Sequence, residues 1–215
     1  MLVRLLLSLI AAVLVLALGT AAYLFVFANG TGRGPLNIQL GSVRLVLSSE
    51  YVRNPDHRIS GEFSELEIAA NTNDFRPATR PDKLRPGMDD ASEGIVYISL
   101  RAQEKSLDPA ERPARLYVRF LEQDEWSHPG GLVMRRFEEG SPFGREDLYM
   151  APPEGRVFAA RCTRPMQPPD GLPNTCLSEM RFNGLDVRLR FSPNHLGDWE
   201  RLVAGVRGLV NSMMK

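Results

Sequence analysis

Apolar residues run from Leu5 to Phe27 without one charged residue, and no later stretch of the chain resembles this one. A helix of this length covers about 34 Å, which exceeds the roughly 30 Å hydrocarbon core of a bilayer. We therefore expect residues 1–28 to form an N-terminal transmembrane anchor, in contact with lipid through residues 5–27. The alternatives are a cleaved secretory signal, because small residues around Thr20 suit a cleavage site, and a helix buried in the protein core.

The clearest strand pattern surrounds Asn183-Gly184. This dipeptide suits a two-residue type I′ turn, because both central residues of that turn need positive φ. The turn would join residues 176–182 to residues 185–191 and fix their register. The pairs expected on one face are Phe182 with Leu185, Met180 with Val187, Ser178 with Leu189 and Cys176 with Phe191, and those on the other are Arg181 with Asp186 and Glu179 with Arg188. One register thus gathers the apolar side chains and also pairs opposite charges.

The two cysteines fall where two strands would meet. Residues 157–162 alternate apolar and other residues, and they end at Cys162. If this run pairs antiparallel with residues 176–182, Cys162 lies near Cys176 and a disulfide can form. The bond would close a 15-residue loop, which is worth about 3 kcal/mol in the chain-entropy model. Two unpaired buried thiols are the alternative, but an export signal in the same chain favours the disulfide.

Further alternating runs predict more strands, so that most of the domain is antiparallel sheet. They span residues 36–40, 43–47, 63–70, 95–102, 114–121, 132–137 and 147–151. Gly41-Ser42 lies where the alternation changes parity, which suggests a bulge or a corner. The polar residues 71–94 are too many for an ordinary connection and predict a long mobile loop.

The chain closes with one expected helix. Ser192-Pro193 suits its start, with serine as the cap and proline in the first turn. Apolar residues then recur every three or four positions up to Met213, which makes one apolar stripe. We expect the stripe to pack on the sheet, although it could instead lie on a membrane surface. The predicted fold class is therefore α+β, a mostly antiparallel sheet covered by a C-terminal amphipathic helix.

The anchor and the cysteines together predict where the domain lies. Residues 29–35 carry glycines at alternating positions and predict a flexible tether, followed by one domain over residues 36–215. Arg4 favours a cytoplasmic N-terminus, and the expected disulfide favours an oxidising compartment for the domain. We expect a single-pass protein of the inner (plasma) membrane with its C-terminal domain on the periplasmic side.

Charge and motifs exclude several functions. Beyond Gly34 the chain has 24 basic and 26 acidic residues, so no nucleic-acid partner is expected. No metal-ligand spacing, phosphate-binding loop or nucleophile elbow is present, so we expect no metal, no cofactor and no enzymatic activity. Trp126 and His128 lie beside a Gly-Gly pair, and this aromatic and histidine could form a recognition loop, although an ordinary turn explains them too.

The chain resembles uncharacterised bacterial proteins that have one N-terminal membrane span and a small exported β-rich domain. The likeness rests on the anchor and on the last 55 or so residues, with the hairpin ending in Arg-Leu-Arg-Phe191 and then His195-Leu-Gly-Asp-Trp199-Glu-Arg-Leu-Val203. It implies the same topology and no activity.

Two hypotheses about function follow. The first is a membrane-anchored binding or assembly module of the cell envelope that acts on a protein partner. A variant of it is an immunity-type protein that blocks a toxin in the periplasm. The alternative is a periplasmic hydrolase that uses His128 or His57 with a carboxylate brought near by folding.

Overall fold

The computed structural model describes residues 16–21, 34–78, 94–164 and 174–215. The chain divides into two compact units, Met1–Gly34 and Pro35–Lys215. In the first unit residues 16–21 are helical and exposed, and most of the predicted anchor lies outside the described residues. No helix among the described residues is long and apolar enough to cross a membrane.

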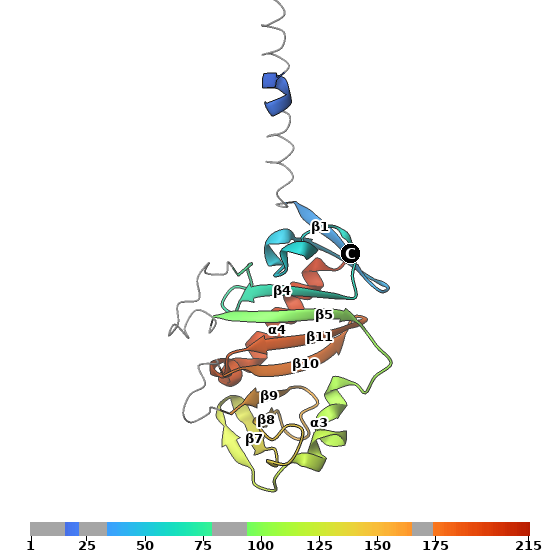
Figure 1. The fold of residues 1–215 in the computed structure, drawn as a ribbon. Coiled ribbons are helices and arrows are strands. Elements are labelled where there is room, and N and C mark those ends of the chain that lie inside the picture. The colour runs from blue at the N-terminus through green and yellow to red at the C-terminus, as the bar shows by residue number, and fades with distance from the viewer. Residues whose placement is uncertain (1–15, 22–33, 79–93, 165–173) are drawn as a thin grey trace, which may run out of the picture. The chain divides into compact units, whose positions relative to one another are not determined.

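The second unit contains two sheets (Figure 1). The strands are β1 (Pro35–Leu40), β2 (Val43–Ser48), β3 (Gly61–Glu62), β4 (Glu65–Asn71), β5 (Ile95–Ala102), β6 (Trp126–His128), β7 (Leu132–Arg136), β8 (Glu146–Met150), β9 (Ala159–Thr163), β10 (Cys176–Phe182) and β11 (Leu185–Phe191). The helices are α3 (Arg112–Arg115) and α4 (Trp199–Met213). The larger sheet has the order β4-β5-β11-β10-β9-β8-β7-β6 and is antiparallel throughout, and the smaller has the order β2-β1-β3. The α+β prediction is confirmed.

The β10–β11 hairpin forms in the predicted register, from Phe182 opposite Leu185 to Cys176 opposite Phe191. Asn183 and Gly184 have φ values of 52° and 76°, as a type I′ turn requires. Phe182 is half-buried, but the other apolar side chains of the inner face are buried, and they include Val187 and Leu189. A two-residue turn therefore sets the register at the centre of an eight-stranded sheet.

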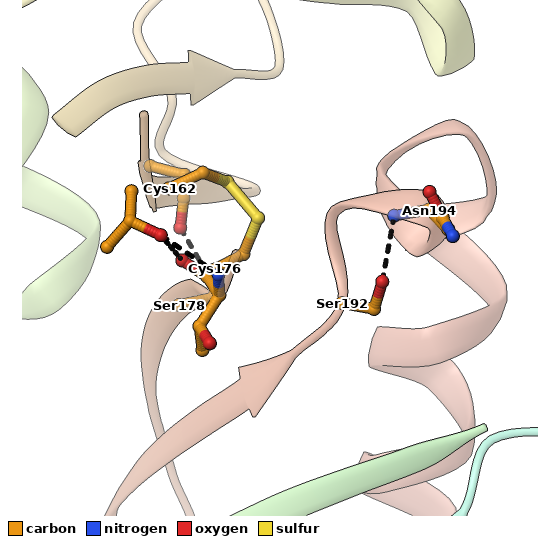
Figure 2. Close-up of a disulfide and its surroundings, with 8 residues drawn as sticks. Cys162, Cys176, Ser178, Ser192 and Asn194 are labelled. Carbon is orange, nitrogen blue, oxygen red and sulfur yellow. Dashed lines mark hydrogen bonds between the residues drawn. A yellow bond between two sulfur atoms is a disulfide. The ribbon is translucent and has the colours of Figure 1, made fainter. Parts of the chain in front are cut away.

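The predicted disulfide between Cys162 and Cys176 is confirmed (Figure 2). The two residues are direct partners across β9 and β10, with 4.0 Å between their Cα atoms. The Thr163 N–H donates to the Thr175 carbonyl at 3.0 Å just beyond them. Backbone bonds therefore flank the cysteine pair, which belongs to the closely spaced, non-hydrogen-bonded class of antiparallel pairs.

Helix α4 buries its predicted stripe against the sheet. The buried side chains are those of Trp199, Leu202, Val203, Val206, Leu209, Val210 and Met213. The predicted cap is present one element earlier, because Ser192 Oγ accepts from the Asn194 N–H at the start of the 3-10 helix η6 (Pro193–Asp198) (Figure 2). The stripe belongs to one apolar core that also contains side chains of β1, β2, β4, β5, β10 and β11.

The smaller sheet corrects the prediction for Gly41-Ser42. These residues are a two-residue hairpin turn between β1 and β2, since Leu40 pairs with Val43, and Gly41 has a φ of 55°. The change of parity that suggested a bulge keeps the apolar residues of both strands on the same face. Strand β3 pairs parallel to β1, and Leu45 of β2 forms a bridge to Met214 at the end of α4.

The strand predicted over residues 114–121 is wrong. This segment is α3 followed by the 3-10 helix η4 (Tyr117–Phe120). Val118 is 47% exposed whereas Tyr117 is buried, so the alternation of Leu116, Val118 and Phe120 did not mark a buried face. The signal that starts this helical segment lies before residue 114. Asp108 Oδ1 accepts a hydrogen bond from the Ala110 N–H at 2.9 Å and caps the 3-10 helix η3 (Pro109–Glu111).

The face of the sheet opposite α4 carries a ladder of alternating charges. Register places Glu65, Arg101, Asp186 and Arg181 side by side across β4, β5, β11 and β10. The hydrogen bond from Arg101 holds the pKa of Glu65 below its ordinary value of 4.5. Burial acts to raise the pKa of Asp186, but bonds from Arg181 and from the Glu104 N–H outweigh it and hold that pKa below 3.8.

We expect removal of the disulfide by Cys162→Ala with Cys176→Ala to lower the free energy of unfolding by about 3 kcal/mol, because the 15-residue loop is no longer closed in the unfolded chain. Urea unfolding followed by tryptophan fluorescence measures it. Reduced wild-type protein is the control and should match the double variant. Equal stability of the oxidised and reduced proteins would contradict the structural role given to this bond.

We also expect stability to fall in acid through the charge ladder. A carboxylate whose pKa is lowered by folding stabilises the protein above its unfolded pKa, and this contribution is lost as pH falls through the folded pKa. Protonation of Glu65 should therefore lower the Tm progressively below about pH 4.5, and protonation of Asp186 should do so below about pH 3.8. Arg101→Gln and Arg181→Gln should flatten this acid limb, while Arg115→Gln at an exposed ion pair should leave its slope unchanged. Parallel acid limbs in all four proteins would refute the assignment.

Candidate functional site

Trp126 and His128, the residues singled out by the sequence, begin and end β6, the last strand of the larger sheet. Strand β6 pairs with β7, and the 3-10 helix η5 (Pro129–Gly131) connects them. Trp126 remains 37% exposed, and His128 is half-buried. The two side chains therefore lie at an edge of the sheet, where protein partners commonly bind.

Register brings three more side chains to this place. Trp126 lies opposite Met134 on β7, and Met134 lies opposite Tyr149 on β8. Direct partners in antiparallel strands project from the same face, so these side chains form a row. His128 and Arg136 share that face because each is two residues from a member of the row. We call Trp126, His128, Met134, Arg136 and Tyr149 the β6–β8 patch.

Arg136 lies over the indole ring of Trp126, with its guanidinium carbon 5.0 Å from the ring centroid. Its neighbour across the sheet, Asp147, is instead engaged by Arg164 at 2.6 Å. Arg136 consequently makes no ion pair with a described acidic residue, and it is exposed. The patch therefore offers a stacked tryptophan and an uncompensated positive charge.

Tyr149 and His128 contact each other edge to face, with ring centroids 4.9 Å apart. Burial, and then the nearby charge of Asp147, raise the pKa of Tyr149 above its ordinary value of 10.0. The phenol thus stays neutral at physiological pH and can donate a hydrogen bond. A half-buried phenol beside an imidazole gives the patch polar groups as well as aromatic surface.

The connection between β6 and β7 is held against the start of α4. The Trp199 Nε1–H donates to the Gly130 carbonyl at 3.0 Å, and the Trp199 ring stacks on Phe158. Gly130 has a φ of 79°, and a Cβ atom there would lie 2.9 Å from the Gly197 carbonyl oxygen. Gly130, the first residue of the Gly-Gly pair that suggested a recognition loop, therefore makes a close contact that fixes the position of β6.

The patch has the composition of a protein-binding surface. Tryptophan, tyrosine, methionine and arginine are enriched at such interfaces, and tryptophan, tyrosine and arginine carry most of their binding energy. Sequence reasoning found Trp126 and His128 but missed Met134, Arg136 and Tyr149. The alternation in β7 and β8 was visible, but the pairing of β6 with β7 is needed to bring Met134 and Arg136 to Trp126, and the pairing of β7 with β8 to add Tyr149. Gly140-Ser141-Pro142 marks a turn between β7 and β8, but a connection as long as residues 137–145 does not fix their register.

The geometry needed by the hydrolase alternative is not met by His57 or His128. Nδ1 of His57 is buried without a hydrogen-bond partner, and its ring packs on Phe63 with centroids 4.9 Å apart. Nδ1 of His128 faces the Pro129 carbonyl at 3.1 Å. No described serine, aspartate or glutamate is hydrogen-bonded to either ring. Within the described ranges no group of three or more metal-ligating side chains occurs.

No family model and no curated protein matches the sequence. The fold is similar to the solved structure of Smlt3025, an immunity protein of the Stenotrophomonas maltophilia type IV secretion system. The TM-score is 0.60 at 14% identity, over 85% of this chain and 94% of the other. The Neisseria meningitidis iron-regulated outer membrane lipoprotein FrpD aligns over the same shares at 14% identity with a TM-score of 0.45. The first similarity shows a shared fold.

We expect Gly130→Ala to lower the free energy of unfolding by roughly 2 kcal/mol, because positive φ and a collision with the Gly197 carbonyl act together. Gly131→Ala is the matched control, since Gly131 has a φ of 69° but open space, with nothing within 4 Å, where the alanine methyl group would lie. Gly131→Ala should lower the free energy of unfolding by roughly 1 kcal/mol, which is the cost of the positive φ alone. Equal losses in urea unfolding would refute the fixed contact.

Proposed function

We propose that the protein is a membrane-tethered module of the bacterial cell envelope that binds a protein partner through the β6–β8 patch. The observation that carries the proposal is the register of β6, β7 and β8, which gathers tryptophan, methionine, arginine and tyrosine on one partly exposed face. A sheet edge with this composition fits a partner that presents apolar surface and at least one carboxylate, because Arg136 has no described acidic partner.

The proposed location rests on two separate features. The disulfide between Cys162 and Cys176 supports an oxidising compartment for the domain. The uncharged stretch from Leu5 to Phe27 supports a membrane anchor with the N-terminus in the cytoplasm. The domain would then lie on the periplasmic side of the inner membrane, tethered by residues 29–35.

We further propose that the partner is a toxin and that binding neutralises it. The support is the fold shared with an immunity protein of a secretion system, together with a surface suited to a protein and not to a small substrate. An inhibitor needs a rigid, preformed surface, since ordering a mobile one reduces affinity. The contact of Trp199 with Gly130 and the neighbouring disulfide provide that rigidity.

Site-specific photocrosslinking tests the proposal in living cells. A photoreactive phenylalanine analogue replaces Trp126 in the full-length chain, expressed in its native host, and crosslinked products are identified by mass. We expect one predominant partner protein at this position, because the partner contacts the patch directly. The same analogue at Glu200, an exposed position on α4, should give no such product.

The toxin part has its own readout in the same strains. Cells that lack the protein should be outgrown by the parent in dense co-culture, and wild-type protein but not the Trp126→Ala, Arg136→Ala variant should restore growth. Absence of a product at Trp126, or the same product at Glu200, would refute binding through the patch. A specific crosslinked product at Trp126 without any difference in growth would refute the proposal that the partner is a toxin. The partner would then be a protein that assembles with this one in the envelope.

A further inference from the structure

The larger sheet has a gap beside β10. Strand β11 pairs with β10 along its whole length, from Cys176 to Phe182. Strand β9 pairs with β10 at three residues, Cys176, Leu177 and Ser178, opposite Cys162, Arg161 and Ala160. From Glu179 onward β10 therefore has a strand neighbour on one side only, although it lies in the interior of the strand order.

The backbone of Arg181 points into this gap. Thr175 directs its carbonyl toward β9, where it accepts from Thr163. Since the direction alternates along an antiparallel strand, the other odd-numbered residues of β10 direct their backbone groups to the same side. No backbone hydrogen bond from another described element reaches the N–H or the carbonyl of Arg181. These two groups form a short open strand edge.

A recess of about 160 Å³ lies at this edge. Helix η3 borders it on one side, and residues 155–159 border it on the other. Tyr117 lines it with a phenol whose pKa is raised, chiefly by burial. A cavity of roughly 150 Å³ holds a benzene-sized group, so the recess has room for one side chain of a bound segment.

Positive charge dominates the lining. Four arginines contribute to it against two acidic residues, Asp108 and Glu179. Arg112 and Arg188 both form ion pairs with Glu179, and Asp108 caps η3, so both acidic residues already have partners.

Two of the lining arginines are less engaged. The guanidinium carbon of Arg207 lies 5.1 Å from the ring centroid of Phe182, and Arg207 has no ion pair with a described acidic residue. The side chain of Arg156 is 59% exposed, and among the described residues its ion pair is with Glu154, which is itself 52% exposed. Arg156 and Arg207 are thus the guanidinium groups available to a ligand.

We propose that this recess binds an extended segment of a protein partner, which adds to β10 as a short strand at Arg181 and places an Asp or Glu side chain against Arg156 and Arg207. An open edge supplies backbone hydrogen bonds to an incoming strand, and neighbouring pockets supply the side-chain preference. Guanidinium groups bind carboxylates through strong charge-assisted hydrogen bonds. The recess shares no residue with the β6–β8 patch, so this proposal goes beyond the proposed function.

Peptide selection tests the recess on the full-length protein in lipid nanodiscs. Random phage-displayed heptapeptides are selected, and the tightest binder is synthesised for fluorescence polarisation. We expect selected peptides to carry Asp or Glu among β-forming residues. Arg156→Gln with Arg207→Gln should weaken binding at least tenfold, as should an amide in place of the peptide's carboxylate. Trp126→Ala should change the Kd by less than twofold.

Backbone methylation of the peptide tests strand addition itself. N-methyl groups on one set of alternate residues should abolish binding, because those N–H groups face β10, whereas the other set should be tolerated. The arginine variants must keep the wild-type Tm, which the exposure of both side chains predicts. Selection of no binder, of binders without an acid, or of binders indifferent to the arginines or to the methylation frame would overturn the proposal. Crosslinking at Trp126 would be unaffected by that failure.

Discussion

The structure depends on the pairing of β10 with its two neighbours. A two-residue Asn-Gly turn fixes β11 on one side, and the disulfide from Cys176 to Cys162 fixes β9 on the other. Because strand side chains have a period of two, these two constraints decide which face of every other strand in the larger sheet is buried. The apolar face then receives α4, and the opposite face carries the ladder from Glu65 to Arg181.

Both candidate binding surfaces follow from how far β9 extends. Along one edge β9 pairs with β8 over its whole length, and the sheet continues through β7 to β6, beyond the stripe that α4 buries, so Trp126 and Tyr149 stay partly exposed. Along its other edge β9 pairs with β10 only as far as Ser178 and leaves Arg181 without a strand neighbour on that side. The β6–β8 patch is rich in aromatic side chains, whereas the recess is rich in arginine. The two surfaces therefore suit different parts of one partner, or two partners.

Local signals predicted the parts of the fold that lie close in sequence. The Asn-Gly turn, the alternation around it, the cysteine positions and the stripe of α4 all led to the correct arrangement. The prediction of a strand over residues 114–121 is wrong because Asp108 and two prolines start helices at and just before this segment. These helix signals outweigh a short run of alternating residues. The patch could be predicted only in part, since Tyr149 joins it through the pairing of β7 with β8, and the turn residues in the long connection 137–145 do not fix that register. The recess could not be predicted, because it forms where the pairing of β9 with β10 ends.

The central claim is that a protein covers the β6–β8 patch in the cell. Hydroxyl-radical footprinting measures this directly, since tryptophan, methionine and tyrosine oxidise readily when solvent reaches them. Oxidation is compared between the full-length protein in membranes of the cells that produce it and the same protein purified in nanodiscs. The account predicts that Trp126, Met134 and Tyr149 are protected in the native membranes, while exposed Ile59, which belongs to neither surface, reacts equally in both. Equal oxidation of Trp126 in the two samples would contradict it.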